Sequence, residues 1–576
     1  MDDDSRPLMK TKLLSALVLT LLLTTQANAA TYTAASMASA DIQAAINAEA
    51  AANPGGLGGD IILVPNVPFN GNVTWTPGGI QFTNPITLQG PGTNGQCFAY
   101  YSDIGNSTPS WTVTCIAAFT TNSSIIGTNE WRITGFEIVG ITNGGPSPGG
   151  KGAIQFIGNG YNMRFDHNLM TNCNDWMVCT YGVCGVIDHN TFINKPGTII
   201  LEWTAENWSG FPNGTGPYAN FADGSWAAPT GLGTSNFMFA EDNMFIPEAG
   251  GSLGIAACDA TAGGRIVMRH NTMTNGLMSL HGTETGGLAR GPRAFEFYLN
   301  TNYQTINADH PVNLRAGTGV CYSNQTIYVL GGSCNPYYQE VCCYGSAGYY
   351  PDWGAFNGTN LLCKNSTNSD GSPVVYAAFT CSNTSVTTPV SSPYYYTVAA
   401  SVASPNWIVD QWRGYSIVDT SEPIGTSQVN YTNFSLVTHN TSNSISFMGN
   451  TTGTSATTVF NAGDACVLYL QQNVIDMPGM GQCTGWVRDP ITTMITNNAI
   501  ALAQAIEPIY TWSNVINGAP VGTTNVYAVV RPGVHFIDGT PAPGYTPYPY
   551  PHPLVSGAPP PSYIPAPPTN LRVVAR

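Results

Sequence analysis

Short runs in which apolar and polar residues alternate occupy most of the chain, and turns rich in Gly, Pro and Asn separate them. Such runs are typical of strands with one buried face. One segment differs: between residues 39 and 52, Ile42 and Ile46 recur at helical spacing, with Ser39 or Asp41 as the expected cap. A helix followed by many short strands is the expected start of a parallel β-solenoid, because the helix covers the open end of the coil stack.

A repeat with the pattern apolar-x-x-Asn-x-apolar then recurs, as FDHNLM, IDHNTF, AEDNMF, MRHNTM and FYLNTN. The repeated residues are Asn168, Asn190, Asn243, Asn271 and Asn300. Steps of 22 to 29 residues fit coils of three short strands, and the one step of 53 contains EWTAENWSGFPNGTGPYANFADGSW, which we interpret as a protruding loop. Asn tolerates a left-handed turn and its amide can bond the coils above and below, so the repeat predicts an Asn ladder. An antiparallel sandwich with NxT turns is the alternative, although hairpin signals are scarce.

Several segments carry a family resemblance. The HNT-type turns, together with HGTETGG, RGPRAFEFYLN, NWIVDQWRGYSIVDT, FNAGDACVLYLQ and GYTPYPYPHPL, resemble those of secreted bacterial right-handed parallel β-helix proteins of the pectate-lyase-like superfamily. The resemblance implies an all-β fold: a right-handed parallel β-helix (solenoid) with an N-terminal capping helix and an additional C-terminal β region. Its motifs are specific for the fold and much less specific for the chemistry.

Composition divides the chain into six parts. Residues 1–29 are an expected Sec-type signal peptide, because Lys10 and Lys12 precede a short apolar run and Ala27-Asn28-Ala29 supplies small residues for cleavage. We therefore expect a secreted or cell-surface protein. The other parts are the β-helix core with its cap at 30–320, Cys/Gly/Tyr-rich loops at 321–394, a small β module at 395–485, coil-like strands at 486–539, and a Pro-rich extended tail at 540–576 that is not expected to build a core.

Charge and cysteine content narrow the possible partners. Only 9% of the residues are charged and the net charge is −15, which argues against nucleic-acid binding because that needs a basic face. No segment after the signal approaches the ~20 apolar residues of a membrane span. We expect a monomer whose partner is a polysaccharide. The 14 Cys favour disulfides of open connectivity, and Cys179 and Cys184 are expected as a disulfide or as buried thiols.

The strongest candidate site is the Gly-rich loop 281–293, HGTETGGLARGPR. Its candidate catalytic residues are His281, Glu284, Arg290 and Arg293. Between residues 264 and 315 the chain has five Arg and no Lys, a cationic island of the kind that an enzyme for an anionic polysaccharide needs. The alternative is a structural loop in which Arg290 and Arg293 pair with Glu284 and Glu296.

Stacking of the coils predicts a second site. Asp166, Asp188, Glu241 and Arg269 each stand two places before a repeated Asn, and strand alternation puts them on the outer face at a spacing of ~4.8 Å. Three stacked carboxylates repel one another unless a cation lies among them, so Asp166, Asp188 and Glu241 are candidate Ca²⁺ ligands. Alternatively, DHN is ordinary turn chemistry and Arg269 neutralises the column. One place later stands a column of turn histidines that could also bind a metal: His167, His189 and His270.

Further residues are expected to bind the substrate. They are aromatic residues in and near the insertion, whose rings can stack on sugars, and two arginines near the loop: Trp203, Trp208, Tyr218, Trp226, Arg269 and Arg315. The insertion could equally be a self-packed surface loop.

These features favour a polysaccharide lyase that cleaves a uronate-containing polysaccharide by β-elimination. A cation then neutralises the uronate carboxylate while a base removes the acidified C5 proton. By analogy with β-helix lyases, Arg293 or Arg290 would be the base and His281 the acid or alternative base.

Two other functions are open. Hydrolysis needs two carboxylates across the bond, for which Glu284 with Asp242 or Glu296 are candidates, although the paired-Asp motifs of polygalacturonase-like hydrolases are absent. A non-catalytic glycan-binding or adhesin solenoid is the third reading. Convergence of His281, Arg290 and Arg293 would favour the enzyme, and side chains lying apart would favour the binder.

Overall fold

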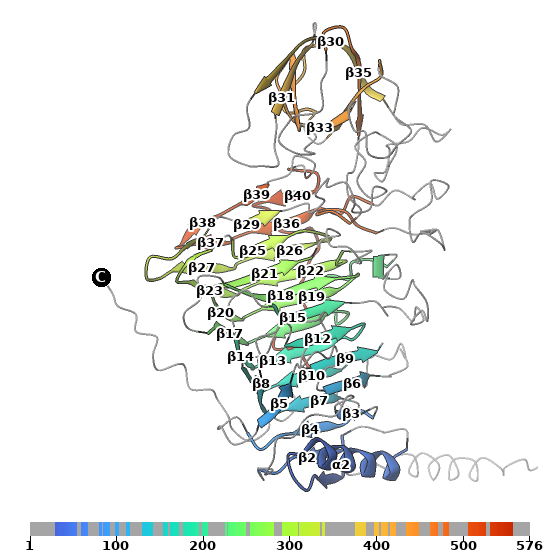
Figure 1. The fold of residues 1–576 in the computed structure, drawn as a ribbon, viewed down its shortest axis with the longest axis vertical. Helices are drawn as coiled ribbons and strands as arrows, with labels where there is room; N and C mark the ends of the chain where they lie inside the picture. The colour runs from blue at the N-terminus through green and yellow to red at the C-terminus, as the bar shows by residue number, and fades with distance from the viewer. Residues whose placement is uncertain are drawn as a thin grey trace, which may run out of the picture.

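Three long parallel sheets and one closed antiparallel barrel make up the protein (Figure 1). The computed structural model describes residues 29–54, 59–66, 80–82, 84–92, 98–102, 111–115, 130–141, 154–158, 162–171, 177–194, 199–204, 225–226, 228–248, 254–281, 291–308, 310–334, 337–339, 375–387, 397–402, 405–412, 415–421, 434–448, 461–470, 476–482, 505–525, 530 and 532–556. Among these residues, no helix combines the length and the apolar character that crossing a membrane requires.

A complete coil contributes one strand to each of three sheets. Sheet A contains, in spatial order, β1 (Thr31–Thr33), β2 (Ile61–Leu63), β4 (Thr87–Gln89), β7 (Trp131–Thr134), β10 (Met163–Asp166), β13 (Gly185–Asp188), β16 (Met238–Glu241), β19 (Arg265–Arg269), β22 (Ala294–Tyr298), β26 (Thr318–Tyr322), β36 (Ile509–Trp512) and β40 (Phe536–Asp538). Sheet B contains β3 (Ile80–Phe82), β6 (Trp111–Cys115), β9 (Ile154–Gly158), β12 (Val178–Tyr181), β15 (Ile199–Thr204), β18 (Ile255–Thr261), β21 (Gly276–Leu280), β25 (Val312–Leu314), β29 (Tyr337–Gln339) and β39 (Thr523–Asn525). Sheet C contains β38 (Ala519–Pro520), β37 (Val515–Ile516), β27 (Gln325–Tyr328), β23 (Thr301–Gln304), β20 (Thr272–Thr274), β17 (Met244–Pro247), β14 (Thr191–Asn194), β11 (Leu169–Thr171), β8 (Glu137–Ile141) and β5 (Phe98–Ser102). The right-handed parallel β-helix expected from the sequence is confirmed.

The hydrophobic core runs inside the three sheets. In sheet A, Phe165, Ile187, Ala240, Met268 and Phe297 occupy equivalent positions of successive coils. All five are fully buried. Because strand residues alternate between faces, the polar residues beside them point outward, so the same pattern that fills the core also lines the outer surface.

The Asn ladder is also confirmed. In each step the side-chain oxygen of one Asn accepts hydrogen bonds from the backbone and side-chain N–H groups of the Asn one coil below, as Asn190 does from Asn168 at 3.0 and 3.1 Å. Two members that the repeat pattern missed extend it, Asn324 and Asn514. The left-handed residue is not the Asn itself but its predecessor, for example His167 with φ 52°. The turn therefore separates two tasks, since the predecessor bends the chain and the Asn bonds the coils.

The step of 53 residues is one enlarged coil. Asn190 and Asn243 are adjacent in the ladder, with Asn190 N–H donating to Asn243 Oδ1 at 3.0 Å. The additional residues leave sheet B after β15 and return at β16, and positions 205–224 lie outside the described residues. The long connections that follow β21 and β29 leave the same sheet and return to sheet A. Long insertions in a solenoid commonly gather on its functional face.

The helix α2 (Ser39–Ala52) packs against the first coils and places Ile42 and Ile46 in the core. Its cap differs from the expectation, because the N-cap is Ala38, which makes no side-chain capping hydrogen bond. At the other end of the molecule (Figure 1), the closed barrel has the strand order β30 (Val375–Thr387), β31 (Thr397–Val402), β34 (Ser444–Met448), β33 (Phe434–Asn440), β32 (Tyr415–Asp419) and β35 (Ala465–Leu470). Its first strand, β30, lies in the part that the sequence assigned to Cys-rich loops, because the Val/Tyr/Phe run there was outweighed by the surrounding Gly and Asn.

After the barrel the chain resumes winding. Strand β36 pairs with β26, and Asn514 joins the ladder directly after Asn324 although 190 residues separate them. A further pair of short strands, β24 (Asn307–Ala308) and β28 (Ser333–Cys334), forms a separate two-stranded sheet at the side.

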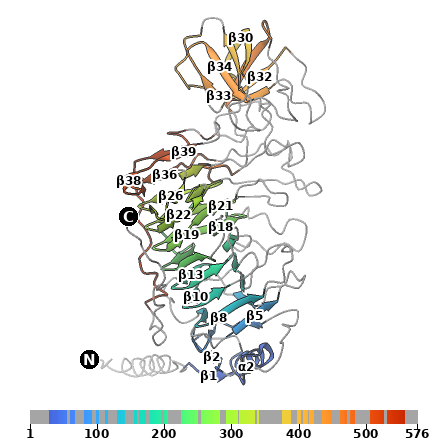
Figure 2. The same ribbon diagram turned by 60° about the vertical axis from the view of Figure 1, so that its left-hand side comes forward.

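The described part of the Pro-rich tail packs against the β-helix. Residues 545–555, which we name the C-terminal strap, lie along the outer face of sheet A and run back toward the N-terminal coils (Figure 2). Leu554 is 4% exposed and belongs to a second hydrophobic cluster with Val186, Phe239 and Val267. The tail cannot build a core by itself, but it completes one on the surface of the β-helix.

Candidate functional site

A cluster of three polar side chains lies on neighbouring strands of sheet B. Asp259 belongs to β18, His281 directly follows β21, and Arg315 directly follows β25. Because Leu280 and Leu314 are paired in register, the next residues of the two strands emerge side by side at one edge of the sheet. This is the edge from which the long connections leave.

The three side chains are in direct contact. His281 Nδ1 lies 2.9 Å from Asp259 Oδ2 and 2.9 Å from Arg315 Nη2. Arg315 Nη2 is also 3.4 Å from Asp259 Oδ1, and Arg315 Nε donates to the carbonyl of Leu280 at 2.6 Å. Ser279 Oγ accepts from the same guanidinium at 3.1 Å, so Arg315 is held on two sides.

The position of His281 Nδ1 allows two proton arrangements. A carboxylate only accepts hydrogen bonds and a guanidinium only donates them, so Nδ1 can serve one partner at a time. With a proton on Nδ1 the ring donates to Asp259, and Nε2 is then a base. Without that proton Nδ1 accepts from Arg315, and Nε2 then carries the hydrogen. The side chains of His281 and Arg315 are 19% and 16% exposed, whereas that of Asp259 is 5% exposed.

Asp259 is the functional candidate that the sequence reasoning missed. The signal was present in IAACDAT, where buried small residues flank the aspartate and strand alternation turns it outward. A register shift between Ala256 and Cys258 breaks the simple count from β18 to β21, so Asp259 could not be aligned with its neighbours from spacing alone.

Two of the predicted catalytic residues, His281 and Arg293, lie in the described part of the chain, and of these two the structure brings His281 to this cluster. Glu284 and Arg290 lie outside the described residues. The assignment of Arg293 as a base needs correction, because its side chain is fully buried and its Nη1 lies 2.9 Å from Glu507 Oε2. Glu296 accepts from the backbone N–H of Gly233 at 2.7 Å. The alternative, in which Arg290 and Arg293 pair with Glu284 and Glu296, stays a prediction because Arg290 and Glu284 lie outside the described residues.

Trp226 is likewise a packing residue. It is fully buried, its Nε1 donates to the Gly291 carbonyl at 3.0 Å, and its ring lies 5.4 Å from the Arg293 guanidinium. A buried ring offers no face to a sugar, which corrects its assignment to substrate binding. Trp203 is in register with Thr180 and Ala260, and Trp208 and Tyr218 lie outside the described residues.

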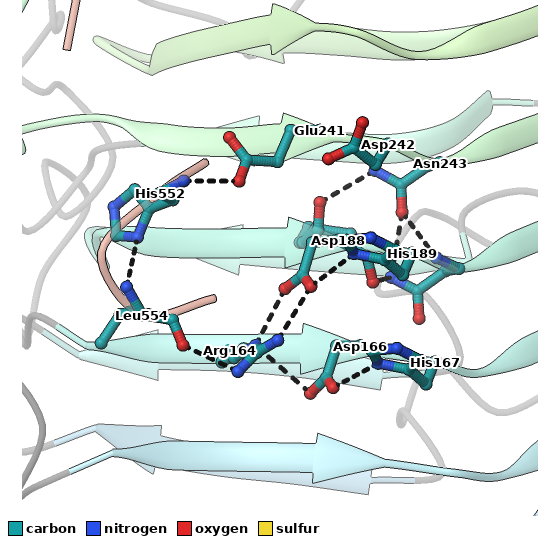
Figure 3. Close-up of polar contacts among 12 residues, drawn as sticks. Arg164, Asp166, His167, Asp188, His189, Glu241, Asp242, Asn243, His552 and Leu554 are labelled. Carbon is teal, nitrogen blue, oxygen red and sulfur yellow. Dashed lines mark hydrogen bonds and ion pairs between the residues drawn. The ribbon is translucent and has the colours of Figure 1, made fainter. Parts of the chain in front are cut away.

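The carboxylate column lies on the outer face of sheet A, where its register places Asp166, Asp188, Glu241 and Arg269 in successive strands (Figure 3). Arg132 binds both oxygens of Asp166, at 2.7 and 2.6 Å, and Arg164 binds both oxygens of Asp188 at 3.0 Å. Three arginines and three carboxylates are therefore balanced in charge. Burial by itself raises the pKa of Asp166, but hydrogen bonds from Arg132 and His167 outweigh it and hold that pKa below its usual value.

Glu241 behaves differently from Asp166. Arg269 Nε donates to Glu241 Oε2 at 2.6 Å, yet burial raises the pKa of Glu241 above its ordinary value. The difference follows from the number of partners, because one arginine faces Glu241 whereas Arg132 and Arg164 both face Asp166. Arg269 is fully buried between Glu241 and the C-terminal strap, which corrects its assignment as a substrate-binding residue.

The histidines that directly follow Asp166 and Asp188 in the sequence stack on each other beside the carboxylate column. The rings of His167 and His189 are parallel, with centroids 5.1 Å apart, and their Nδ1 atoms bond Asp166 and Asp188 at 2.7 and 2.9 Å (Figure 3). Ligand atoms of Asp166, His167 and Asp188 come within 4.8 Å of one another, as a metal site requires. The carboxylates are nevertheless bonded to arginines, so the donor set does not favour Ca²⁺, and calcium binding at Asp166, Asp188 and Glu241 stays a prediction.

The chain is similar to known proteins in its fold alone. No protein-family model matches the chain, and no curated protein does. Among solved structures, the tailspike protein of E. coli bacteriophage HK620 in complex with a pentasaccharide is similar over 75% of this chain and 90% of that chain, with 11% identity and a TM-score of 0.24. A mutant of the same tailspike, also with a pentasaccharide, has 10% identity over the same shares, with a TM-score of 0.25. Likeness at this level carries no functional argument, and the assignment of the fold rests on the strand register.

Proposed function

We propose that the protein is a secreted, carbohydrate-active β-helix protein of the pectate-lyase-like superfamily that cleaves a uronate-containing polysaccharide by β-elimination. The observation that carries this proposal is the cluster of Asp259, His281 and Arg315 at the edge of sheet B. It joins a proton carrier to a cation that is held in place, and β-elimination on a uronate needs both.

The geometry supports a simple division of roles. Arg315 would face the C6 carboxylate of the sugar and draw off its negative charge, which acidifies the C5 proton. His281, with Nδ1–H donated to Asp259, would take that proton on Nε2. The electron pair of the C5–H bond then forms the C4–C5 double bond as the C4–O bond breaks, and the imidazolium returns the proton to the leaving oxygen. Asp259 orients the ring and stabilises its charged form.

The test is the absorbance at 235 nm that an unsaturated uronate produces, measured with and without EDTA on pectin, alginate, ulvan and glucuronan. We expect one of these substrates to respond, and His281→Asn to lower the rate roughly 10²-fold or more. His439→Asn is the matched control, because His439 also pairs with an aspartate, Asp410, but in the barrel. An EDTA effect would support the predicted calcium ion. Equal loss in the two variants would refute the assignment of His281.

One observation favours glycoside hydrolysis as a second candidate. Glu202 in β15 is in register with Asp259 in β18, so two carboxylate residues occupy equivalent positions in adjacent strands of sheet B. The backbones of neighbouring strands are ~4.8 Å apart, and retaining glycosidases use two carboxylates ~5 Å apart. Reducing ends released without absorbance at 235 nm, and lost in both Asp259→Asn and Glu202→Gln, would establish hydrolysis in place of elimination.

A non-catalytic glycan-binding solenoid is the outcome if neither product forms. Retardation of the protein in gels that contain the same polysaccharides would then reveal binding. Loss of that retardation in Arg315→Ala would place the bound glycan at sheet B.

A further inference from the structure

The C-terminal strap binds the outer face of sheet A mainly through its backbone. Arg269 donates from Nη1 to the carbonyl of Tyr548 at 2.7 Å and from Nη2 to that of Pro549 at 2.8 Å. Arg164 Nη1 donates to the carbonyl of Leu554 at 2.7 Å. In the reverse direction, the backbone N–H of His552 donates to Glu241 Oε1 at 2.7 Å (Figure 3).

Side chains of the strap fill apolar and aromatic positions between these bonds. The ring of Tyr550 stacks on His270 with centroids 3.7 Å apart, and its hydroxyl donates to Asp242 Oδ1 at 2.8 Å. The rings of Tyr548 and His552 lie 5.3 and 4.9 Å from that of Phe239. The binding face is therefore an aromatic and charged surface on successive strands of sheet A.

The sequence of the strap explains this mode of binding. In YTPYPYPHPLV every second residue from Pro547 to Pro553 is proline. Proline has no N–H and a fixed φ, so the segment cannot pair as a strand. Its carbonyl groups are presented along a backbone that runs without turns from Tyr545 to Pro549 and turns at residues 552–555. Arginine side chains supply the donors that such a backbone needs, and aromatic-lined grooves are a recurrent way of binding proline-rich segments.

The β-helix itself orients the arginines that bind the strap. Arg269 is anchored by Glu241 and Arg164 by Asp188, so each guanidinium is oriented by the body and uses its remaining N–H groups for the strap. Residues of the strap are 249 to 390 positions away from their partners in the chain. Gly539, Thr540 and Pro541, which precede the strap, are exposed.

We propose that the outer face of sheet A, from β10 to β22, is a binding site for a proline-rich peptide, which the chain fills with its own residues 545–555. The strap is a ligand that is tethered to its receptor. The body therefore holds the strap after the tether is cut, and accepts the same peptide in trans.

The test starts from the full chain, in which a protease recognition sequence replaces residues 539–543. The folded protein is cleaved there and passed over a size-exclusion column, and the eluted species are identified by mass spectrometry. We expect the cleaved tail to elute with the body, and a fluorescent peptide of residues 544–556 in excess to replace it. Immediate release of the tail, with no uptake of the fluorescent peptide by the body, would overturn the proposal.

Matched variants locate the site. Arg164→Lys keeps a charge beside Asp188 but loses the guanidinium bond to Leu554, so we expect roughly tenfold or greater weakening of peptide binding. Arg132→Lys is the control, because Arg132 pairs with Asp166 in the adjacent coil and no bond from it to the strap occurs among the described residues. A peptide with Tyr550→Ala and Leu554→Ala should not compete. Equal weakening of peptide binding in both Lys variants, or competition by the altered peptide, would show that the tail is held without a specific binding site.

Discussion

The outer faces of sheets A and B carry similar side chains and use them differently. On sheet A, Glu241 and Arg269 are fully buried, and the C-terminal strap covers them. On sheet B, Asp259, His281 and Arg315 form a set of comparable chemistry, but the side chains of His281 and Arg315 stay 19% and 16% exposed. Residue types and spacing alone would assign both faces to chemistry. The difference is the strap. It separates the paired charges of sheet A from solvent and leaves them a structural role, whereas the charged side chains of sheet B reach solvent and can contact a substrate.

The largest expected effect separates the two faces by stability. Arg269→Ala should lower the free energy of unfolding by about 3–5 kcal/mol, because it leaves Glu241 buried without its cation. Arg315→Ala should lower it less, because Arg315 is 16% exposed and Asp259 keeps His281 as a partner at 2.9 Å. Urea unfolding followed by tryptophan fluorescence measures both. Equal losses would mean that sheet B is as much a structural face as sheet A.

Activity should separate the faces in the opposite order. Asp259→Asn should lower kcat roughly 10²-fold with little change in KM, since the ring of His281 loses the acceptor that orients it. The matched change on sheet A, Asp188→Asn, should leave kcat unchanged in the fraction that folds. Kinetics on the responsive polysaccharide decide this, and a KM effect without a kcat effect would reduce Asp259 to a binding role.

Acidification should loosen only the covered face. Burial, followed by the charges of Arg269 and Arg164, lowers the pKa of His552 to about 3, and its Nδ1 accepts the backbone N–H of Leu554 at 3.2 Å. The folded protein thus keeps this ring neutral, while the unfolded chain takes up a proton below the ordinary pKa of about 6.5. The stability contributed by the neutral ring is present above that pH and is lost as the pH falls toward 3, by up to about 1.4 kcal/mol per pH unit.

A variant isolates this effect. His552→Asn retains an acceptor for the Leu554 N–H but does not titrate. The raised pKa of Glu241 acts in the opposite direction in both proteins, so it cancels in their difference. The difference in unfolding free energy between the two proteins should therefore be constant above pH 7 and change below it. A difference that is flat down to pH 4 would refute the role of His552.

Oxidation of two cysteines in the barrel should have the smallest effect on the two faces. Cys381 and Cys466 lie on the neighbouring strands β30 and β35, and their Sγ atoms are 2.9 Å apart. We expect oxidised glutathione to join them, with loss of two protons and two electrons, and to stabilise the barrel by about 2–4 kcal/mol. Alkylation and mass spectrometry would detect the bond. We expect this bond to leave the β-helix unchanged. A change in the position of the strap or of the His281 cluster on oxidation would contradict that expectation.

The sequence predicted what is periodic and missed what is not. Alternation recurs along the coils and the Asn recurs in successive coils from Asn168 to Asn514, so they indicated the β-helix and its ladder. The strap has no such period, since its partners are up to 390 residues away and its prolines suggest only an extended chain. Arg293 was misassigned because a glycine-rich loop looks accessible in sequence, whereas Trp226 and Glu507 bury it. Asp259 was missed because a register shift hides its alignment with β21.

The return of the coil after the barrel has a consequence for how this architecture can be altered. The excursion starts after β29 and ends at β36, and strand β39 of the resumed coil pairs directly with β29. A module whose own ends lie close together could be spliced in at this rung without changing the winding on either side. The β-helix is thus a host into which evolution or an engineer can graft a domain, and the barrel occupies one such graft point.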